Sequence, residues 1–298
     1  MRYFEFVTYA VINVTGKDAR RYLNARLTCN VKDLAANNFS FGAQLTAQGK
    51  CQGTFSLINL DDSKFILVSS YAPLQQILSN FRQFIVADRV DTVDSTSEYK
   101  HIHLVLDESE SKEIVKLLDL PAFPTSSAIQ SSANGIIAWA NNRGFNLGLD
   151  LLIPVNLFDD FLKKISDKSQ EKLSDDQMLI GRAKANSAQF SVDIDNLIFS
   201  EAHVPDYVSF TKGCYVGQEV IERIDAMGKT AWKIIPFKSQ HFIAAKSQLN
   251  DNFGSIINCS TGKIDGAHWG FARVKNAANL ESKLSSTEGI EIEICDLK

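Results

Sequence analysis

The residues best suited to chemistry in this sequence lie in one short run, from Phe210 to Glu219. Its cysteine, Cys214, follows Lys212 and stands between Gly213 and Gly217, and the residues after the second glycine have the pattern of a helix. A thiol ahead of a helix N-terminus and beside a cation is favoured as the thiolate, which is the nucleophilic form. Cys214 is therefore a candidate nucleophile. A tight glycine turn around a small residue explains the same spacing, and it is the better interpretation from residue types alone.

The other four cysteines do not form a recognisable site. Cys29, Cys51, Cys259 and Cys295 are isolated, there is no Cys-x-x-Cys pair, and no histidine stands near a cysteine at a metal-ligand spacing. An odd number of scattered cysteines argues against a disulfide framework and against a structural zinc site. The sequence thus predicts no metal site, and these residues are expected to pack as small apolar side chains.

Composition restricts the class of protein. The chain has 298 residues, of which 45% are hydrophobic and 22% are charged, as in an ordinary globular protein of about two domains. A net charge of −4 argues against broad nucleic-acid binding by bulk electrostatics. No apolar run reaches the roughly 18 residues of a membrane helix, and the first residues lack the pattern of a signal peptide. We therefore expect a cytoplasmic protein without a membrane partner.

The elements that must position Cys214 fall into two parts. Before about residue 227, alternation and helical periodicity predict a mixture of strands and helices, and after it only short strands follow. The sequence therefore predicts an α+β region over residues 1–227 and a small C-terminal β-barrel over residues 228–298. The predicted helices span residues 19–27, 73–84, 110–120, 178–185 and 217–224. The predicted strands span residues 4–14, 39–46, 51–60, 64–70, 99–106, 128–141 as a hairpin, 147–153, 233–237, 255–258, 270–274 and 289–295, and residues 166–172 are a predicted surface loop.

Two of these helices carry further charged candidates. Arg20, Arg21 and Arg26 lie on or near the first predicted helix, where they form either a small basic patch for RNA or a partner, or a solvated helix face. Arg223 follows Glu219 by four residues. It therefore pairs with that carboxylate, or it is available to bind a carboxylate or phosphate group of a ligand.

The run Lys212-Gly-Cys214-Tyr-x-Gly217-Gln218-Glu219 resembles the signature of the YgfZ family, the folate-binding relatives of the glycine-cleavage T-protein. The family pattern is close to K-G-C-[FY]-x-G-Q-E and is often followed by an arginine, in whose place Arg223 stands. Residues 14–31 resemble the family's opening, G-x-D-A-x-x-[FY]-L-x-x-x-L-T-x-D-V, with Asn30 where aspartate is usual. Residues 48–50 resemble the turn of the family's second hairpin, and residues 270–274 are similar to its strand-rich C-terminal barrel, so the resemblance extends over nearly the whole chain.

The resemblance implies a GcvT/YgfZ-like fold, with a folate-binding α+β unit of two subdomains and a C-terminal β-barrel. It implies tetrahydrofolate or a derivative as cofactor, and support of iron–sulfur cluster assembly or repair in client enzymes and, through them, tRNA modification. Direct contact with tRNA is left open. It also implies that Cys214 is a functional thiol in a cavity between the two parts, with Lys212 either tuning its pKa or solvated. The expected folate-binding residues are Asn24, Gly213, Tyr215, Gly217, Gln218, Glu219 and Arg223.

The sequence departs from the T-protein at the positions that perform acid–base chemistry. The T-protein has an aspartate shortly after the glycine that corresponds to Gly49, but here residues 51–54 contain no carboxylate. Its glutamate-bearing helix is replaced by residues 181–186, again without a carboxylate. Since proton transfer to the folate-linked amine needs such a group, we predict no aminomethyltransferase activity. A folate-dependent one-carbon transferase and a non-catalytic folate-binding scaffold with an inert Cys214 are the alternative functions.

Overall fold

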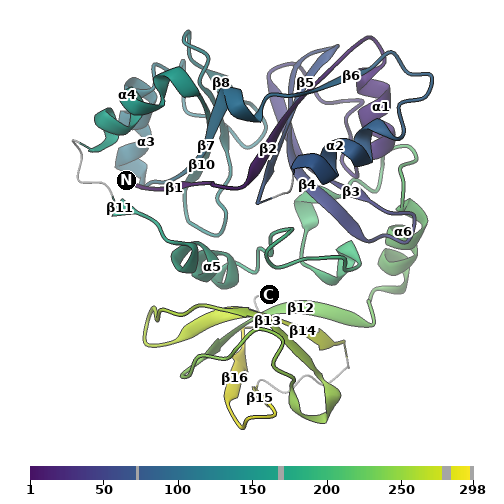
Figure 1. The fold of residues 1–298 in the computed structure, drawn as a ribbon, viewed down its shortest axis with the longest axis vertical. Coiled ribbons are helices and arrows are strands. Elements are labelled where there is room, and N and C mark those ends of the chain that lie inside the picture. The colour runs from purple at the N-terminus through teal and green to yellow at the C-terminus, as the bar shows by residue number, and fades with distance from the viewer. Residues whose placement is uncertain (72–73, 167–170, 277–282, 296–298) are drawn as a thin grey trace.

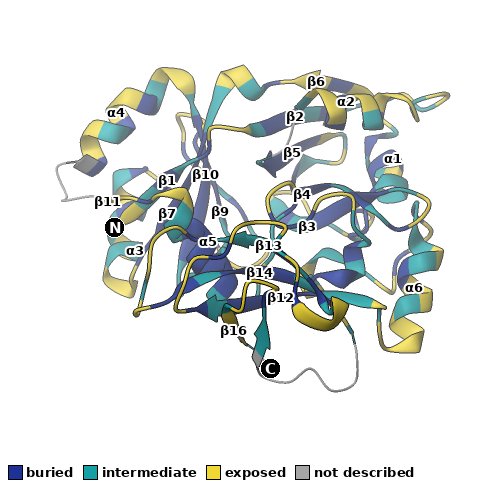
Figure 2. Cartoon of the chain, turned by 60° about the horizontal axis from the view of Figure 1, so that its bottom comes forward, coloured by how far each residue is buried: buried dark blue, intermediate teal, exposed yellow. Residues whose placement is uncertain are grey.

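The computed structural model describes residues 1–71, 74–166, 171–276 and 283–295. Three β-sheets form its framework: two lie beside each other in the upper half of Figure 1, and the third lies below them. The strands are mostly buried, whereas exposed residues gather on the outer sides of the helices and on connecting loops (Figure 2). Among the described residues, no helix combines the length and the hydropathy that a membrane crossing requires.

The first sheet is antiparallel, with the order β3-β4-β5-β2-β6. Successive side chains of a strand alternate between its faces, so Phe55 and Leu57 of β4 pack against helix residues such as Leu23 and Phe81, while Ile58 packs toward the second sheet. The sheet and its two helices are β2 (Tyr9–Thr15), β3 (Asn38–Leu45), β4 (Cys51–Asp61), β5 (Lys64–Ser70), β6 (Asp91–Asp94), α1 (Ala19–Arg26) and α2 (Leu74–Arg82).

The second sheet has the order β11-β1-β7-β10-β9-β8, and only the β1–β11 pair is parallel. Its helices bury Ile114, Phe161 and Ile165 against one face. On the other face Trp139 and Leu152 pack against the first sheet, so one apolar layer joins the two sheets. The elements are β1 (Arg2–Glu5), β7 (Tyr99–Val105), β8 (Gln130–Ser131), β9 (Ile137–Ala140), β10 (Gly148–Pro154), β11 (Glu171–Lys172), α3 (Glu108–Leu117) and α4 (Val155–Ser166).

A linking segment leads from the second sheet to the third. It contains α5 (Asp175–Lys184), the short 3-10 helices η2 (Phe199–Glu201) and η3 (Pro205–Tyr207), and α6 (Gln218–Met227). The third sheet, with the order β13-β14-β12-β16-β15, curls into a half-barrel. Its strands are β12 (Trp232–Ser239), β13 (Gly254–Cys259), β14 (His268–Lys275), β15 (Lys283–Ser285) and β16 (Glu291–Ile294).

Several polar contacts attach the third sheet and its loops to the linking segment. Asp176 of α5 accepts hydrogen bonds from Thr261 Oγ1 at 2.5 Å and from the Gly262 amide at 2.7 Å. On the other side, Arg273 of β14 donates to both carboxylate oxygens of Glu201, at 2.6 and 2.9 Å. These contacts fix the half-barrel against α5 and η2.

The fold class predicted from the sequence is confirmed, and a few elements differ from prediction. The single strand expected over residues 4–14 is two strands, because the chain passes from the second sheet (β1) to the first (β2) between them. The helix α4 was not predicted, and the expected surface loop over residues 166–172 contains β11. Pro73, the expected start of a helix, lies outside the described residues. We propose that the unit boundary falls at about residue 227, where α6 ends and before β12 begins.

Candidate functional site

The lysine of the Cys214 run is bound to the first helix. Its ammonium Nζ donates to the carbonyl oxygens of Asn24, at 2.5 Å, and Leu27, at 2.6 Å, and lies 5.0 Å from the centre of the Tyr215 ring. The last carbonyl groups of a helix have no partner within the helix, and a cation is favoured there. Lys212 therefore caps α1, a contact that no local sequence signal indicates.

Burial lowers the pKa of Lys212 to about 8, with Cys29 acting in the opposite direction. The unfolded chain keeps an ordinary lysine pKa of about 10.5, so between pH 8 and 10.5 the unfolded state binds the proton and the folded state does not. The free energy of unfolding should therefore rise with pH in this window. The test is urea unfolding of the parent and of Lys212→Met from pH 7 to 10.5. A stability difference between them that stays flat or falls with pH would contradict the assignment.

The glycines of the run are required by a close backbone approach. Gly217 has φ of +86°, and a Cβ at this position would lie 2.6 Å from the carbonyl oxygen of Thr46 in the β3–β4 turn. In the same turn Gly49 has φ of +75°, and its Cβ would lie 2.9 Å from Val220 of α6. A larger residue at either position would separate the two segments. The structure thus joins three segments that carry the family resemblance: the end of α1, the β3–β4 turn and the Cys214 run.

Other predicted site residues hold the Cys214 loop and the loop after α1 in shape. The Tyr215 amide donates to Gln218 Oε1 at 3.2 Å, and Gln218 Nε2 donates to Glu222 at 2.6 Å. The Tyr215 ring is buried, and burial raises the pKa of its hydroxyl to about 12. Asn24 accepts from the amides of Val31 and Lys32, at 3.0 and 3.2 Å.

Three predicted residues face solvent. Glu219 and Arg223 are exposed on α6, and Gly213 is exposed with open space around its Cα. Cys214 is exposed as well, whereas Cys29 and Cys51 are buried. Cys214 does not line the cavity of about 450 Å³ between α6 and β12. The expectation that its thiol lies at the surface of a cavity between the α+β region and the half-barrel stays a prediction, and the thiol itself is exposed.

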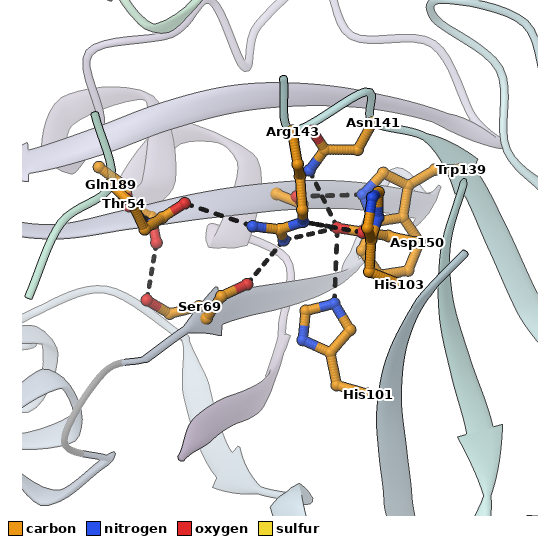
Figure 3. Close-up of polar contacts among 11 residues, drawn as sticks. Thr54, Ser69, His101, His103, Trp139, Asn141, Arg143, Asp150 and Gln189 are labelled. Atoms are coloured by element: carbon orange, nitrogen blue, oxygen red, sulfur yellow. Dashed lines mark hydrogen bonds and ion pairs between the residues drawn. The ribbon is translucent and has the colours of Figure 1, made fainter. Parts of the chain in front are cut away.

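A second group of functional candidates lies between the two upper sheets, around Asp150 of β10 (Figure 3). Its fully buried carboxylate accepts from Arg143 Nη2 at 2.6 Å and from Asn141 Nδ2 at 2.9 Å. His103 Nδ1 lies 2.8 Å from the same carboxylate, and His101 Nε2 lies 3.5 Å from it. Burial opposes ionisation, but Arg143 and these hydrogen bonds hold the pKa of Asp150 well below its ordinary value.

Both histidines of this group are fully buried. Burial lowers the pKa of His101 and of His103, with Asp150 acting in the opposite direction. The His101 ring stacks on Phe6, with centroids 4.2 Å apart, and on Trp139, 5.8 Å apart. In the sequence these histidines are two scattered residues. Their common partner, Asp150, comes to lie beside them only when the sheets form.

Arg143 connects Asp150 to the other sheet and to the linking segment. It donates to Ser70 Oγ at 2.7 Å and to Gln189 Oε1 at 3.3 Å. Gln189 in turn donates to Thr54 Oγ1 at 3.1 Å (Figure 3). Sequence reasoning missed Arg143 and Asp150. The one available signal was an aspartate inside the apolar strand predicted over residues 147–153.

Arg143 also lines a cavity of about 490 Å³. Its walls come from β3, from the β9–β10 connection and from the linking segment, and they include Phe41 and Tyr207, whose rings stack with centroids 5.4 Å apart. The exposed carboxylate of Asp206 is part of the lining. The polar lining groups are otherwise uncharged apart from Arg143: Ser40, Ser126, Asn141, Asn142 and Ser187. A stacked aromatic wall facing amide, hydroxyl and carboxylate groups fits a flat, polar-edged ring.

No buried acid is available for general base catalysis in the described part of the chain. Its three buried carboxylates are Asp150, Asp193 and Glu201, and each is paired with an arginine. Thr54, from the segment where the T-protein has its aspartate, is hydrogen-bonded to Gln189. Within the same residues, no group of three or more potential ligands is placed to hold a metal ion.

Comparisons with known proteins agree with this fold. No protein-family model matches the chain. The tRNA-modifying protein YgfZ of Colwellia psychrerythraea is 24% identical over 259 residues, which cover 84% of this chain and 77% of that protein. The tRNA-modifying protein YgfZ of Photobacterium profundum is 25% identical over 255 residues, covering 83% and 73%. The crystal structure of glycine cleavage system aminomethyltransferase T from Bartonella henselae superposes with a TM-score of 0.82 at 14% identity, covering 99% of this chain and 85% of that one.

Proposed function

We propose that this chain, which is similar to YgfZ proteins at 24–25% identity and shares the fold of a glycine cleavage aminomethyltransferase, is a tetrahydrofolate-binding protein of the YgfZ family that supports iron–sulfur cluster assembly or repair in client enzymes. Through those clients it would support tRNA modification, the role named in its relatives. The cytoplasmic location stays a prediction, as does the absence of aminomethyltransferase activity.

The observation that carries the folate proposal is the cavity lined by Phe41, Tyr207 and Asp206. The pterin ring of tetrahydrofolate is bicyclic and largely flat, so it can stack on an aromatic wall. Its aminopyrimidinone edge presents parallel N–H groups that a carboxylate binds in a bidentate manner. Asp206 supplies such a carboxylate, and the amides of Asn141 and Asn142 supply the mixed donors and acceptors that the rest of the ring needs.

We assign ligand binding and thiol chemistry to separate places. The expected ligand contacts from Gly213 to Arg223 do not line this cavity, and the hydrogen bonds of Tyr215 and Gln218 hold the Cys214 loop in shape. Exposure of Cys214 leaves its sulfur accessible to a partner's sulfur or iron. Residues 51–54 and 181–186, which stand where the T-protein carries its acids, contain no carboxylate, and this disfavours the alternative of aminomethyl transfer.

Calorimetric titration of tetrahydrofolate into the purified protein tests the ligand site. Tyr207→Ala should raise the Kd about tenfold, because the loss of one stacked ring costs about 0.5–1.5 kcal/mol beyond the lost apolar contact. Tyr207→Phe keeps the ring and should bind as the parent does. Phe242→Ala, at an exposed phenylalanine of the half-barrel region, and Cys214→Ala should also leave the Kd unchanged. Equal affinity of Tyr207→Ala and the parent, or no binding by the parent, would refute this site.

A further inference from the structure

A groove of about 450 Å³ lies between the linking segment, α6 and β12. Its apolar lining comes from all three of these elements: Ala202, Val204, Pro205, Val208, Phe210, Ile221, Ile224, Ile234 and Ile235. Phe210 is 50% exposed, which is unusual for a phenylalanine that has an apolar groove beside it. The cavity that we assign to folate has a different lining, with no residue in common.

Two lysines and two carboxylates line the groove, and one of the carboxylates is neutralised by an arginine outside the lining. Lys229 and Lys233 lie at the end of α6 and the start of β12, and they form no ion pair within the described residues. Glu201 also lines the groove, but both of its oxygens are bonded to Arg273. Asp225 is thus the one carboxylate of the lining that is not paired with a cation in the part of the chain that the structure describes. An occupant with an acidic group complements this charge distribution.

The groove adjoins the Cys214 loop. Phe210 precedes Cys214 by four residues and Ile221 follows it by seven, and both of these flanking residues line the groove. Gly217 holds the loop against the β3–β4 turn. A chain seated between η3 and α6 would therefore contact residues on both sides of Cys214 in the sequence.

We propose that this groove is the docking site for a client-protein segment that combines a large apolar side chain with a neighbouring aspartate or glutamate. The apolar side chain would pack on Val208, Phe210 and Ile224, and the acidic group would pair with Lys229 or Lys233. The groove's aliphatic floor favours a protein segment over RNA, whose phosphates are recognised by several closely placed cations. The identification of the partner as a client rests on the proposed function.

Selection of a random twelve-residue peptide display library on the full-length protein tests the proposal, with counter-selection on Ile224→Glu. Enriched peptides should share an apolar residue with an acidic residue within four positions. In fluorescence anisotropy, the Kd of these peptides should be at least tenfold higher for the double variant Lys229→Glu/Lys233→Glu than for the parent. The reason is that the attraction between each lysine and the acidic residue of the peptide becomes a repulsion. Peptides with lysine in place of the acidic residue should recover affinity for the reversed variant. Lys246→Glu, at an exposed position of the half-barrel, is the matched control and should not change the Kd.

The outcomes separate this inference from the folate proposal. Tetrahydrofolate titrated into Lys229→Glu/Lys233→Glu should bind with the parent's Kd, since neither lysine lines the folate cavity. Peptide binding without folate binding would refute the folate site and leave the groove assignment intact. The groove assignment would be overturned if no peptide were enriched or if the enriched peptides were basic. It would also be overturned if Lys229→Glu/Lys233→Glu left the peptide Kd unchanged. A short RNA stem-loop that binds the groove in place of peptides would overturn it as well.

Discussion

Asp150→Ala is expected to lower the free energy of unfolding by about 3–5 kcal/mol, the cost of breaking a buried ion pair on one side. The variant leaves the buried Arg143 guanidinium without its counter-ion, and Asn141 and His103 lose their common partner. The lost carboxylate is fully buried between two sheets, so its partners are left with an unfilled acceptor position in the protein interior. The loss should be seen in urea unfolding at pH 7.

Two comparisons make the Asp150 prediction specific. Asp160→Ala removes an exposed carboxylate on α4 that pairs with Lys163 at 3.6 Å, and it should change stability by less than about 0.5 kcal/mol. Asp150→Ala combined with Arg143→Met removes both charges, so part of the stability should return. A loss below about 1 kcal/mol for Asp150→Ala would show that the ion pair does not hold the sheets together.

Cys214→Ala is expected to abolish the support of iron–sulfur clients in cells while leaving the fold intact. The thiol is exposed, so its removal creates no cavity and the thermal midpoint should stay within about 2 °C of the parent. In a strain that lacks the corresponding protein, the level of a tRNA modification made by an iron–sulfur enzyme should stay at least tenfold below that restored by the parent gene. Cys214→Ser should fail in the same way, because a hydroxyl is neither a soft metal ligand nor an efficient nucleophile.

Alkylation gives an independent test of the same thiol. Cys214 should react with iodoacetamide before the other cysteines, since Cys29 and Cys51 are buried and burial raises the pKa of both thiols. Burial also raises the pKa of Cys259 and Cys295. Cys295→Ala is the matched control and should restore tRNA modification fully. If Cys214→Ala restores it equally well, the Cys214 run is only a tight glycine turn.

Local signals in the sequence predicted many of the elements. Ser174 and Gln177 form the capping box that starts α5, and residues 134–135 turn the β8–β9 hairpin. The helix α4 was not predicted from the sequence, because it begins directly after Pro154 of β10 and has no capping residue to mark its start. Its apolar residues nevertheless recur with helical spacing, at Phe158, Phe161 and Ile165.

The sites were less predictable, because their residues meet only in the folded chain. Motif spacing identified Cys214, but the partners of Lys212 lie more than 180 residues away in α1. Phe41 and Tyr207, which form the aromatic wall of the cavity, come from separate parts of the fold and share no local pattern. Periodicity describes which side of a strand or helix is apolar; it does not specify which of these sides face each other.

The separation of β1 from β2 gives the polypeptide a definite order of assembly during synthesis. All five strands of the first sheet lie within residues 9–94, whereas β1 must wait for β7, at residues 99–105, and for β11, at residues 171–172. A nascent chain emerging at about 5–20 residues per second thus completes the first sheet while its Ile58, Ile66 and Val68 are still uncovered by Trp139 and Leu152. During this interval of several seconds, the apolar face is open to aggregation and is a natural target for a ribosome-associated chaperone.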